Sequence, residues 1–167
     1  MGKWEVILLL GSNLGNRNSH LEKGIGHIAN LIGKIVQTSN IYESAPWGFQ
    51  AENSFLNQAI KVKTDMGPRS ILHTIWKIEQ TSGRERSADG YASRTLDIDI
   101  LTWESKIFWT QKLQVPHIQL QNRKFALLPL TELVGDQVHP VLSKTYDSLL
   151  KSCPDQTWVK SIAQSHA

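Results

Sequence analysis

Hydrophobic periodicity along this chain alternates between the spacing of strands and the spacing of helices, and the order of the segments restricts the fold. Strands show a period of two residues or a short continuous apolar run, whereas helices repeat apolar residues every three to four positions. The predicted segments are strand 6–10, helix 21–32, strand 34–44, strand 55–64, helix 68–81 and strand 94–103. This β-α-β-β-α-β order predicts a ferredoxin-like α+β fold, with a mainly antiparallel sheet and helices packed on both faces.

The remaining third of the chain carries shorter signals. A short strand at 107–109 is expected to pair with strand 94–103, and helices are expected at 122–133 and 145–151. The chain has 167 residues, and domains cluster at about 100 to 150 residues, so one domain is expected. We place that domain at 1–160 and expect a loose C-terminal tail at 161–167.

Composition and charge exclude several classes of protein. The formal net charge of +3 is too small to predict a nucleic-acid surface, although it suits an anionic ligand. Cys153 is the only cysteine, which excludes an intramolecular disulfide and a cysteine-rich zinc site and indicates a reducing compartment. The apolar run 6–10 is too short to cross a bilayer. We therefore expect a cytoplasmic monomer without nucleic-acid or membrane partners.

The strand at 94–103 contains the sharpest candidate site, in the sequence LDIDIL. Because side chains alternate along a strand, Asp97 and Asp99 project from one face, about 6.6 Å apart. Leu96, Ile98 and Ile100 project from the other face. Carboxylate oxygens are preferred ligands of Mg²⁺, and paired metal ions occur at phosphoryl-transfer sites. A solvated strand face is the alternative for an isolated acidic pair.

Three arginines precede this acidic pair, and they change its interpretation. Arg84 and Arg86 lie in a polar, Gly-containing loop, and Arg94 stands three residues before Asp97. Guanidinium groups match phosphate oxygens, whereas carboxylates alone would repel a triphosphate. Acids, metal and arginines together indicate a nucleotide-phosphate site. The alternative is that the arginines only neutralise nearby carboxylates in surface ion pairs.

A second group of polar side chains occurs in the segment 115–125, VPHIQLQNRKF. His117 and Arg123 surround a short turn there, and an imidazole or a guanidinium can contact phosphate. A structural histidine at a turn is an equally good interpretation of His117.

A third group combines aromatic rings with one amide. Trp47, Phe49, Phe55 and Asn57 together suit a flat heterocycle that has donors and acceptors at its edge. Core packing alone also explains Phe55.

Five segments resemble, in order, the motifs of one enzyme family. They are GSNLG at 11–15, SAPWG at 44–48, FLNQA at 55–59, SRTLDIDIL at 93–101 and VPHIQLQNRKF at 115–125. From about Val6 to Leu150 the chain resembles the 6-hydroxymethyl-7,8-dihydropterin pyrophosphokinases of folate biosynthesis, whose fold is ferredoxin-like. The resemblance implies two substrates, ATP and 6-hydroxymethyl-7,8-dihydropterin. The pterin hydroxymethyl oxygen would attack the β-phosphorus of ATP, and AMP would leave.

The same resemblance implies roles for individual residues. Asp97 and Asp99 would bind two Mg²⁺ ions and would form the catalytic group together with Arg84 and Arg94. The implied pterin-binding residues are Ser44, Pro46, Trp47, Phe55, Asn57 and Phe125. The implied ATP-binding residues are Glu79, Arg84, Arg86, Arg94, Ile100, Lys112, His117 and Arg123.

Two rival classes share parts of this pattern. Some RNA-binding modules have the same β-α-β-β-α-β order, but their string of base-stacking sheet aromatics is not visible here. A metal-dependent nucleotidyltransferase or phosphohydrolase would use the same acid pair. The nucleotide product separates these enzymes, because AMP is expected from the pyrophosphokinase, and pyrophosphate or ADP from the others.

Overall fold

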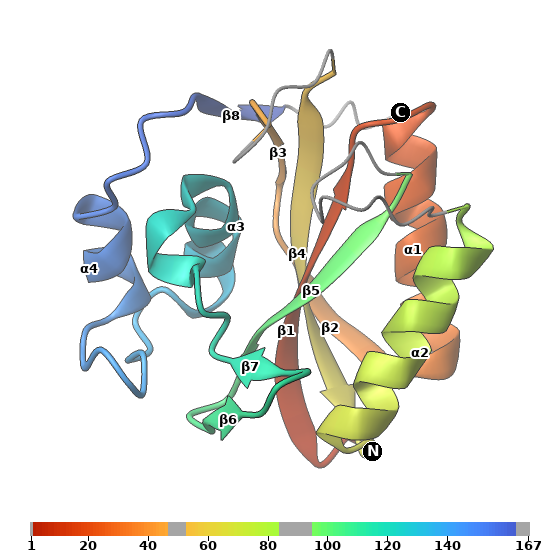
Figure 1. Ribbon diagram of the computed structural model, residues 1–167, viewed down its shortest axis with the longest axis horizontal. Coiled ribbons are helices and arrows are strands. Elements are labelled where there is room, and N and C mark those ends of the chain that lie inside the picture. Colours follow the sequence, from red (N-terminus) through yellow and green to blue (C-terminus); the bar gives the residue numbers. More distant parts are fainter. Residues whose placement is uncertain (1, 47–52, 84–94, 163–167) are drawn as a thin grey trace.

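The protein forms three layers, with a central sheet covered by two helices on each face (Figure 1). The computed structural model describes residues 2–46, 53–83 and 95–162. Trp47, Phe49, Arg84, Arg86 and Arg94 lie outside these ranges. The predicted α+β class, with a mainly antiparallel sheet and helices on both faces, is confirmed.

All strand pairs of the central sheet are antiparallel across the described residues. The six strands are β1 (Trp4–Ser12), β2 (Lys34–Thr38), β3 (Ile41–Ser44), β4 (Phe55–Thr64), β5 (Asp97–Trp103) and β8 (Val159–Ile162). Their order is β5-β1-β4-β3-β8, and β2 also pairs with β4. The β4 strand is therefore central, β1 lies between it and β5, and β5 lies at the edge of the sheet.

Helix boundaries follow local chemistry. The helices are α1 (Arg17–Leu31), α2 (Pro68–Thr81), α3 (Lys124–Val134) and α4 (Tyr146–Lys151). The Asn16 side chain caps α1 by accepting from Ser19 N–H at 3.1 Å, and α2 begins at Pro68, whose missing N–H costs nothing in a first turn. Within the described ranges, no helix is long and apolar enough to cross a membrane.

Two hydrophobic cores lie on opposite faces of the sheet, and β1 contributes to both. Leu8 and Leu10 pack with α1 and α2, whereas Ile7 and Leu9 pack with α3 and α4. Because side chains alternate along a strand, a strand buried on both faces must be apolar at successive positions. This explains the continuous apolar run at 6–10.

The predicted strand at 34–44 is two strands rather than one. The Ser39 N–H donates to the Ala59 carbonyl, but the return bond from Ala59 N–H goes to Ser39 Oγ, both at 2.9 Å. The Ser39 carbonyl accepts instead from Gln58 Nε2 at 3.0 Å. A side-chain oxygen thus replaces the backbone acceptor and interrupts the regular pairing with β4, so that β2 and β3 are separate strands.

Two further expectations about short strands were wrong. The short strand β6 (Phe108–Trp109) pairs with β7 (Gln114–Val115) in a separate hairpin and not with β5. The strand β8 was not predicted, and its residues Ser161 and Ile162 pair with β3 inside the segment expected to be a loose tail. A four-residue strand has too little periodicity to be recognised without its partner. A 3₁₀ turn, Leu120–Asn122, leads into α3.

Candidate active site

The acidic pair lies where the alternation of β5 predicts. Asp97 is opposite Gly11 and Asp99 is opposite Leu9 of β1, so both carboxylates lie on the face that α3 and α4 cover. Leu96, Ile98 and Ile100 are buried in the core on the other face, as predicted. Among the residues described, no three His, Cys, Asp or Glu side chains are grouped to hold a metal ion. A Mg²⁺ ion at this pair would need ligands from a substrate or from water, as Mg²⁺ commonly has.

Glu79 supports the acidic strand from behind. Its side chain is buried, and Oε2 accepts a hydrogen bond from Ile98 N–H at 2.9 Å. That N–H belongs to the residue between Asp97 and Asp99, on an edge strand whose outer groups need partners. The predicted contact of Glu79 with ATP stays a prediction, because the carboxylate is not among the groups that line the nearby pocket.

Gly11 leaves the sheet surface open between the acidic pair on β5 and the amide of Asn57 on β4. It lies opposite Asp97 on one side and opposite Asn57 of β4 on the other. A Cβ atom at this position would lie 3.5 Å from Asn57 Oδ1 and 3.7 Å from Phe55 Cδ1. Any longer side chain would therefore occupy the space beside these two residues, so glycine keeps the row from Asp97 to Asn57 open.

The orientation of Asn57 is defined by its hydrogen bonds. Its buried Nδ2 donates to Ser44 Oγ at 2.8 Å and to the Tyr42 carbonyl at 3.3 Å. With both amide hydrogens used in this way, Oδ1 faces Gly11. The site thus presents an acceptor atom to the open row, which suits a heterocycle with N–H donors at its edge.

The pairing register of β3 and β4 brings most of the predicted pterin-binding residues together. Ser44 pairs with Phe55, and Asn57 follows two residues later on the same face of β4. Pro46 lies two residues beyond Ser44, and Trp47 is outside the described residues. Phe125 lies in the first turn of α3 and packs on the core of the same face of the sheet. The predicted sandwich of a pterin between Phe55 and Phe125 stays a prediction.

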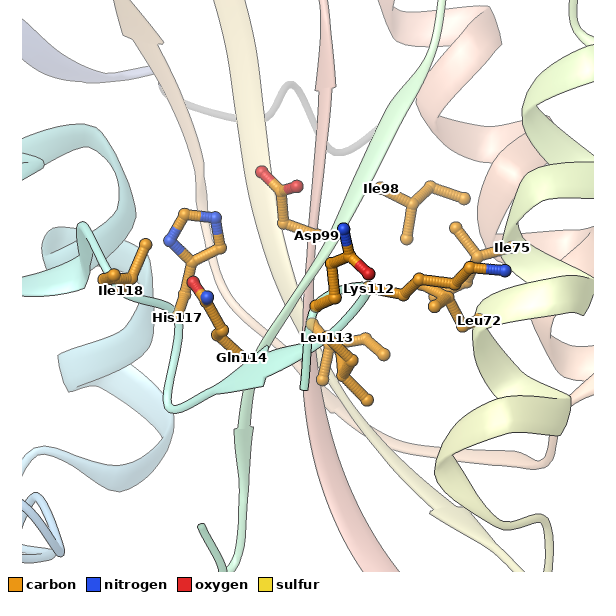
Figure 2. A pocket seen from close by; sticks show the side chains of 11 residues that line it. Leu72, Ile75, Ile98, Asp99, Lys112, Leu113, Gln114, His117 and Ile118 are labelled. Carbon is orange, nitrogen blue, oxygen red and sulfur yellow. The ribbon is translucent and has the colours of Figure 1, made fainter. Parts of the chain in front are cut away.

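A pocket of about 250 Å³ wraps around the edge of β5 (Figure 2). Its polar side is formed by Asp99, Gln114 and His117, and Leu72 and Ile75 of α2 lie on the opposite side, with Ile98. Its remaining lining residues are Ile100, Gln111, Lys112, Leu113 and Ile118. The pocket therefore has an apolar end and a polar end, an arrangement suited to a nucleotide with its base and phosphates apart.

His117 has both a structural contact and a position at the pocket. Its Nδ1 accepts from Gln119 N–H at 3.2 Å, which leaves the ring hydrogen on Nε2. Burial, and then the positive charge of Arg123, lower the pKa of His117 to about 4, against the opposing effect of Asp97. His117 is therefore a neutral hydrogen-bond donor at physiological pH.

Apart from Glu79, the residues predicted for ATP and metal binding divide into three groups in the structure. Asp99, Ile100, Lys112 and His117 line one pocket, as a shared site requires. Arg123 lies at the start of α3, with its guanidinium carbon 5.8 Å from the Phe125 ring centroid. The three loop arginines lie outside the described residues.

Sequence reasoning missed the apolar end of the pocket. Leu72 and Ile75 lie in the helix predicted at 68–81 but were not singled out for the site, and neither were Ile98 and Gln114. The available signal was weak: Ile98 was expected on the face opposite the aspartates, but nothing local showed that this strand lies at an edge.

Comparisons with known proteins agree with this geometry. A family model described as 7,8-dihydro-6-hydroxymethylpterin-pyrophosphokinase matches residues 7–135. A 2-amino-4-hydroxy-6-hydroxymethyldihydropteridine pyrophosphokinase of Aquifex aeolicus is 37% identical over 139 residues, covering 83% of this chain and 86% of that protein. The protein of the same name from Haemophilus influenzae is 33% identical over 154 residues, covering 92% and 95%.

Solved structures show a similar fold. A Plasmodium falciparum HPPK-DHPS structure with pteroate matches with a TM-score of 0.73 at 18% identity. The match covers 91% of this chain and 43% of that longer chain. Together with the extent of the family match, these comparisons identify the chain: it belongs to the 7,8-dihydro-6-hydroxymethylpterin-pyrophosphokinase family.

Proposed function

We propose that this protein transfers pyrophosphate from ATP to the hydroxymethyl group of 6-hydroxymethyl-7,8-dihydropterin, giving AMP and the pterin diphosphate. The relatives named above are pyrophosphokinases of this kind. The observation that carries the proposal is the single row Asn57, Gly11 and Asp97 across three adjacent strands. This row joins an amide suited to a heterocycle with an acidic pair, of which Asp99 lines the pocket of about 250 Å³.

The two substrates are assigned to opposite sides of the acidic pair. ATP would place its base at the apolar end of the β5 pocket and its phosphates near Asp99 and His117. The pterin would lie over Gly11 and donate an edge N–H to Asn57 Oδ1, with Ser44 beside it. The hydroxymethyl group would then face the phosphates close to Asp97, and the reacting groups would be held in position before the transfer.

The acidic pair fits a divalent cation. Both carboxylates project from one face of β5, and they provide the hard oxygen ligands that Mg²⁺ prefers. We propose that Asp97 and Asp99 hold two Mg²⁺ ions together with ATP oxygens. When bound, the ions would neutralise phosphate charge and polarise the reacting oxygens.

The protein itself contributes mainly position and charge, because phosphoryl transfer needs little covalent chemistry from the enzyme. The hydroxymethyl oxygen forms a bond to the β-phosphorus as the bond from that phosphorus to the AMP oxygen breaks. Asp97 is proposed to take the hydroxyl proton. His117 Nε2–H would donate to a phosphate oxygen, and Arg84 and Arg94 would neutralise charge on the moving group or on AMP.

Further residues are proposed on the nucleotide side. Arg86 and Lys112 would add positive charge near the phosphates, and Arg123 would do so from the start of α3. All groups used here come from one chain, so we propose that a monomer is sufficient, as the sequence predicts. The cytoplasm, with its ATP supply, is the proposed compartment.

The RNA-binding alternative is disfavoured by packing. Ferredoxin-like RNA-binding modules stack bases on an open sheet face. Here α3 and α4 cover the face that carries Asp97 and Asn57, with Leu127 and Leu130 buried against it. A base-stacking platform is therefore not available across the middle of the sheet.

Product analysis tests the proposal. The protein is mixed with ATP, Mg²⁺ and 6-hydroxymethyl-7,8-dihydropterin, and nucleotides are separated with and without the pterin. AMP that forms only with the pterin is the expected result, and Asp97→Asn is the control that should form none. ADP or free pyrophosphate as the product would assign the site to another phosphotransfer reaction.

A further inference from the structure

The C-terminal strand β8 covers the edge of the short strand β3. All four residues of β3 pair with β8, from Ile41 with Ile162 to Ser44 with Val159. The Ala45 N–H then donates to the Trp158 carbonyl at 3.3 Å, so the contact continues one residue past β3. Strand β8 therefore holds the backbone that carries Ser44 and leads to Pro46.

A half-buried junction around Glu43 extends this support to β4. Glu43 Oε1 lies 3.4 Å from Lys160 Nζ of β8. Its Oε2 accepts from Arg17 Nη1 at 3.0 Å and from Ser54 Oγ at 2.9 Å, and Arg17 Nη1 also donates to the Ser54 carbonyl. One carboxylate thus joins β3, α1, β8 and the residue that precedes Phe55.

The charges at this junction support its stability. Burial alone would raise the pKa of Glu43, but hydrogen bonds from Ser54, Arg17 and Lys160 outweigh it and hold the pKa below its usual value. Glu43 is therefore ionised at neutral pH, and a partly buried carboxylate needs its cationic partners.

Strand β3 and the start of β4, which this junction supports, carry residues of the proposed pterin subsite. Ser44 Oγ accepts from Asn57 Nδ2 at 2.8 Å, so the position of β3 decides how the Asn57 amide is turned. The family match ends at residue 135, and β8 lies beyond it.

We propose that β8 is a positioning element of the pterin subsite, acting through the Ser44–Asn57 hydrogen bond and through the Lys160–Glu43 junction. The inference rests on the proposed function, since it concerns the substrate subsite of that reaction. It assigns β8 no contact with the reacting atoms.

Two truncations test the role of the strand. Chains ending at Thr157 and at Ile162 differ by the loss of Trp158 and β8. The shorter chain should show a KM for the pterin raised about tenfold or more, because small displacements of positioning groups are costly. The KM for ATP should change less than twofold in both chains, and the longer chain should match the full-length protein. An equal pterin KM in the two truncations would overturn the proposal.

Point variants test the junction if the shorter chain does not fold. Lys160→Glu places a second carboxylate beside Glu43 and should raise the pterin KM about threefold, whereas Lys160→Arg should restore it. Lys151→Glu, an equal charge change on α4, is the control. An unchanged pterin KM in Lys160→Glu would count against the junction.

Hydrogen exchange separates this proposal from the reaction itself. Loss of β8 should speed amide exchange in both β3 and residues 55–58 of β4, and Lys160→Glu should do so to a smaller degree. If the wild-type protein forms no AMP from the pterin, the proposed function fails, and the exchange data still decide whether β8 orders the Ser44–Asn57 pair. Unchanged exchange at 55–58 without β8 would refute the coupling.

Discussion

Replacement of Glu79 tests how helix α2 supports the acidic strand. Residue Glu79 is 5% exposed, and its Oε2 is 2.9 Å from the backbone nitrogen of Ile98, which lies between the two aspartates in the sequence. In Glu79→Ala the edge N–H loses this acceptor. In Glu79→Gln an amide oxygen of nearly the same size can still accept, so this variant is the matched control.

The expected loss follows from this contact. A hydrogen bond to a charged group contributes about 1.5–3 kcal/mol, and the methylenes lost in Glu79→Ala increase the cost. We expect Glu79→Ala to lower the free energy of unfolding by about 2–3 kcal/mol and Tm by about 4–10 °C. Glu79→Gln should lose about half as much. A displaced acidic pair should also lower kcat by about tenfold or more in the alanine variant.

Urea unfolding and steady-state kinetics measure both effects. The reasoning is refuted if Glu79→Ala lies within about 0.5 kcal/mol of the wild-type protein, which is the usual range for substitutions that remove no buried contact. A raised KM for ATP with unchanged stability would also refute the supporting role. It would show instead that Glu79 contacts the nucleotide directly.

Three further predictions concern the site. The pKa of His117 is about 4 in the folded protein and 6.5 in an unfolded chain, so the unfolded state takes up the proton first. Stability should therefore be complete above about pH 6.5 and fall by up to about 3 kcal/mol towards pH 4, and urea titrations of His117→Asn should show a flatter dependence. Asp97→Asn and Asp99→Asn should each lower kcat at least about 100-fold with unchanged Tm; near-normal turnover would remove the metal assignment. Gly11→Val should raise the pterin KM about tenfold or more, and Gly11→Ala should raise it less; equal KM values would show that the row over Gly11 is not used.

The sequence alone determined the elements and the faces of their side chains. Alternation in LDIDIL placed Asp97 and Asp99 on one face and Ile98 on the other, and both placements are confirmed. The continuous apolar run at 6–10 indicated a strand, which is β1 in the structure. These properties depend on the local repeat of a strand, so a few neighbouring residues are enough to reveal them.

Only the tertiary structure decided which segments, distant in the sequence, are neighbours in space. It placed β5 at an edge, so that Ile98 borders a pocket as well as a core, and it turned Glu79 towards the N–H between the aspartates. It also paired β8 with β3 and brought Lys160 to Glu43, across more than 100 residues. Such contacts depend on strand order and register, which arise from the packing of distant segments and leave no periodic signal in either one.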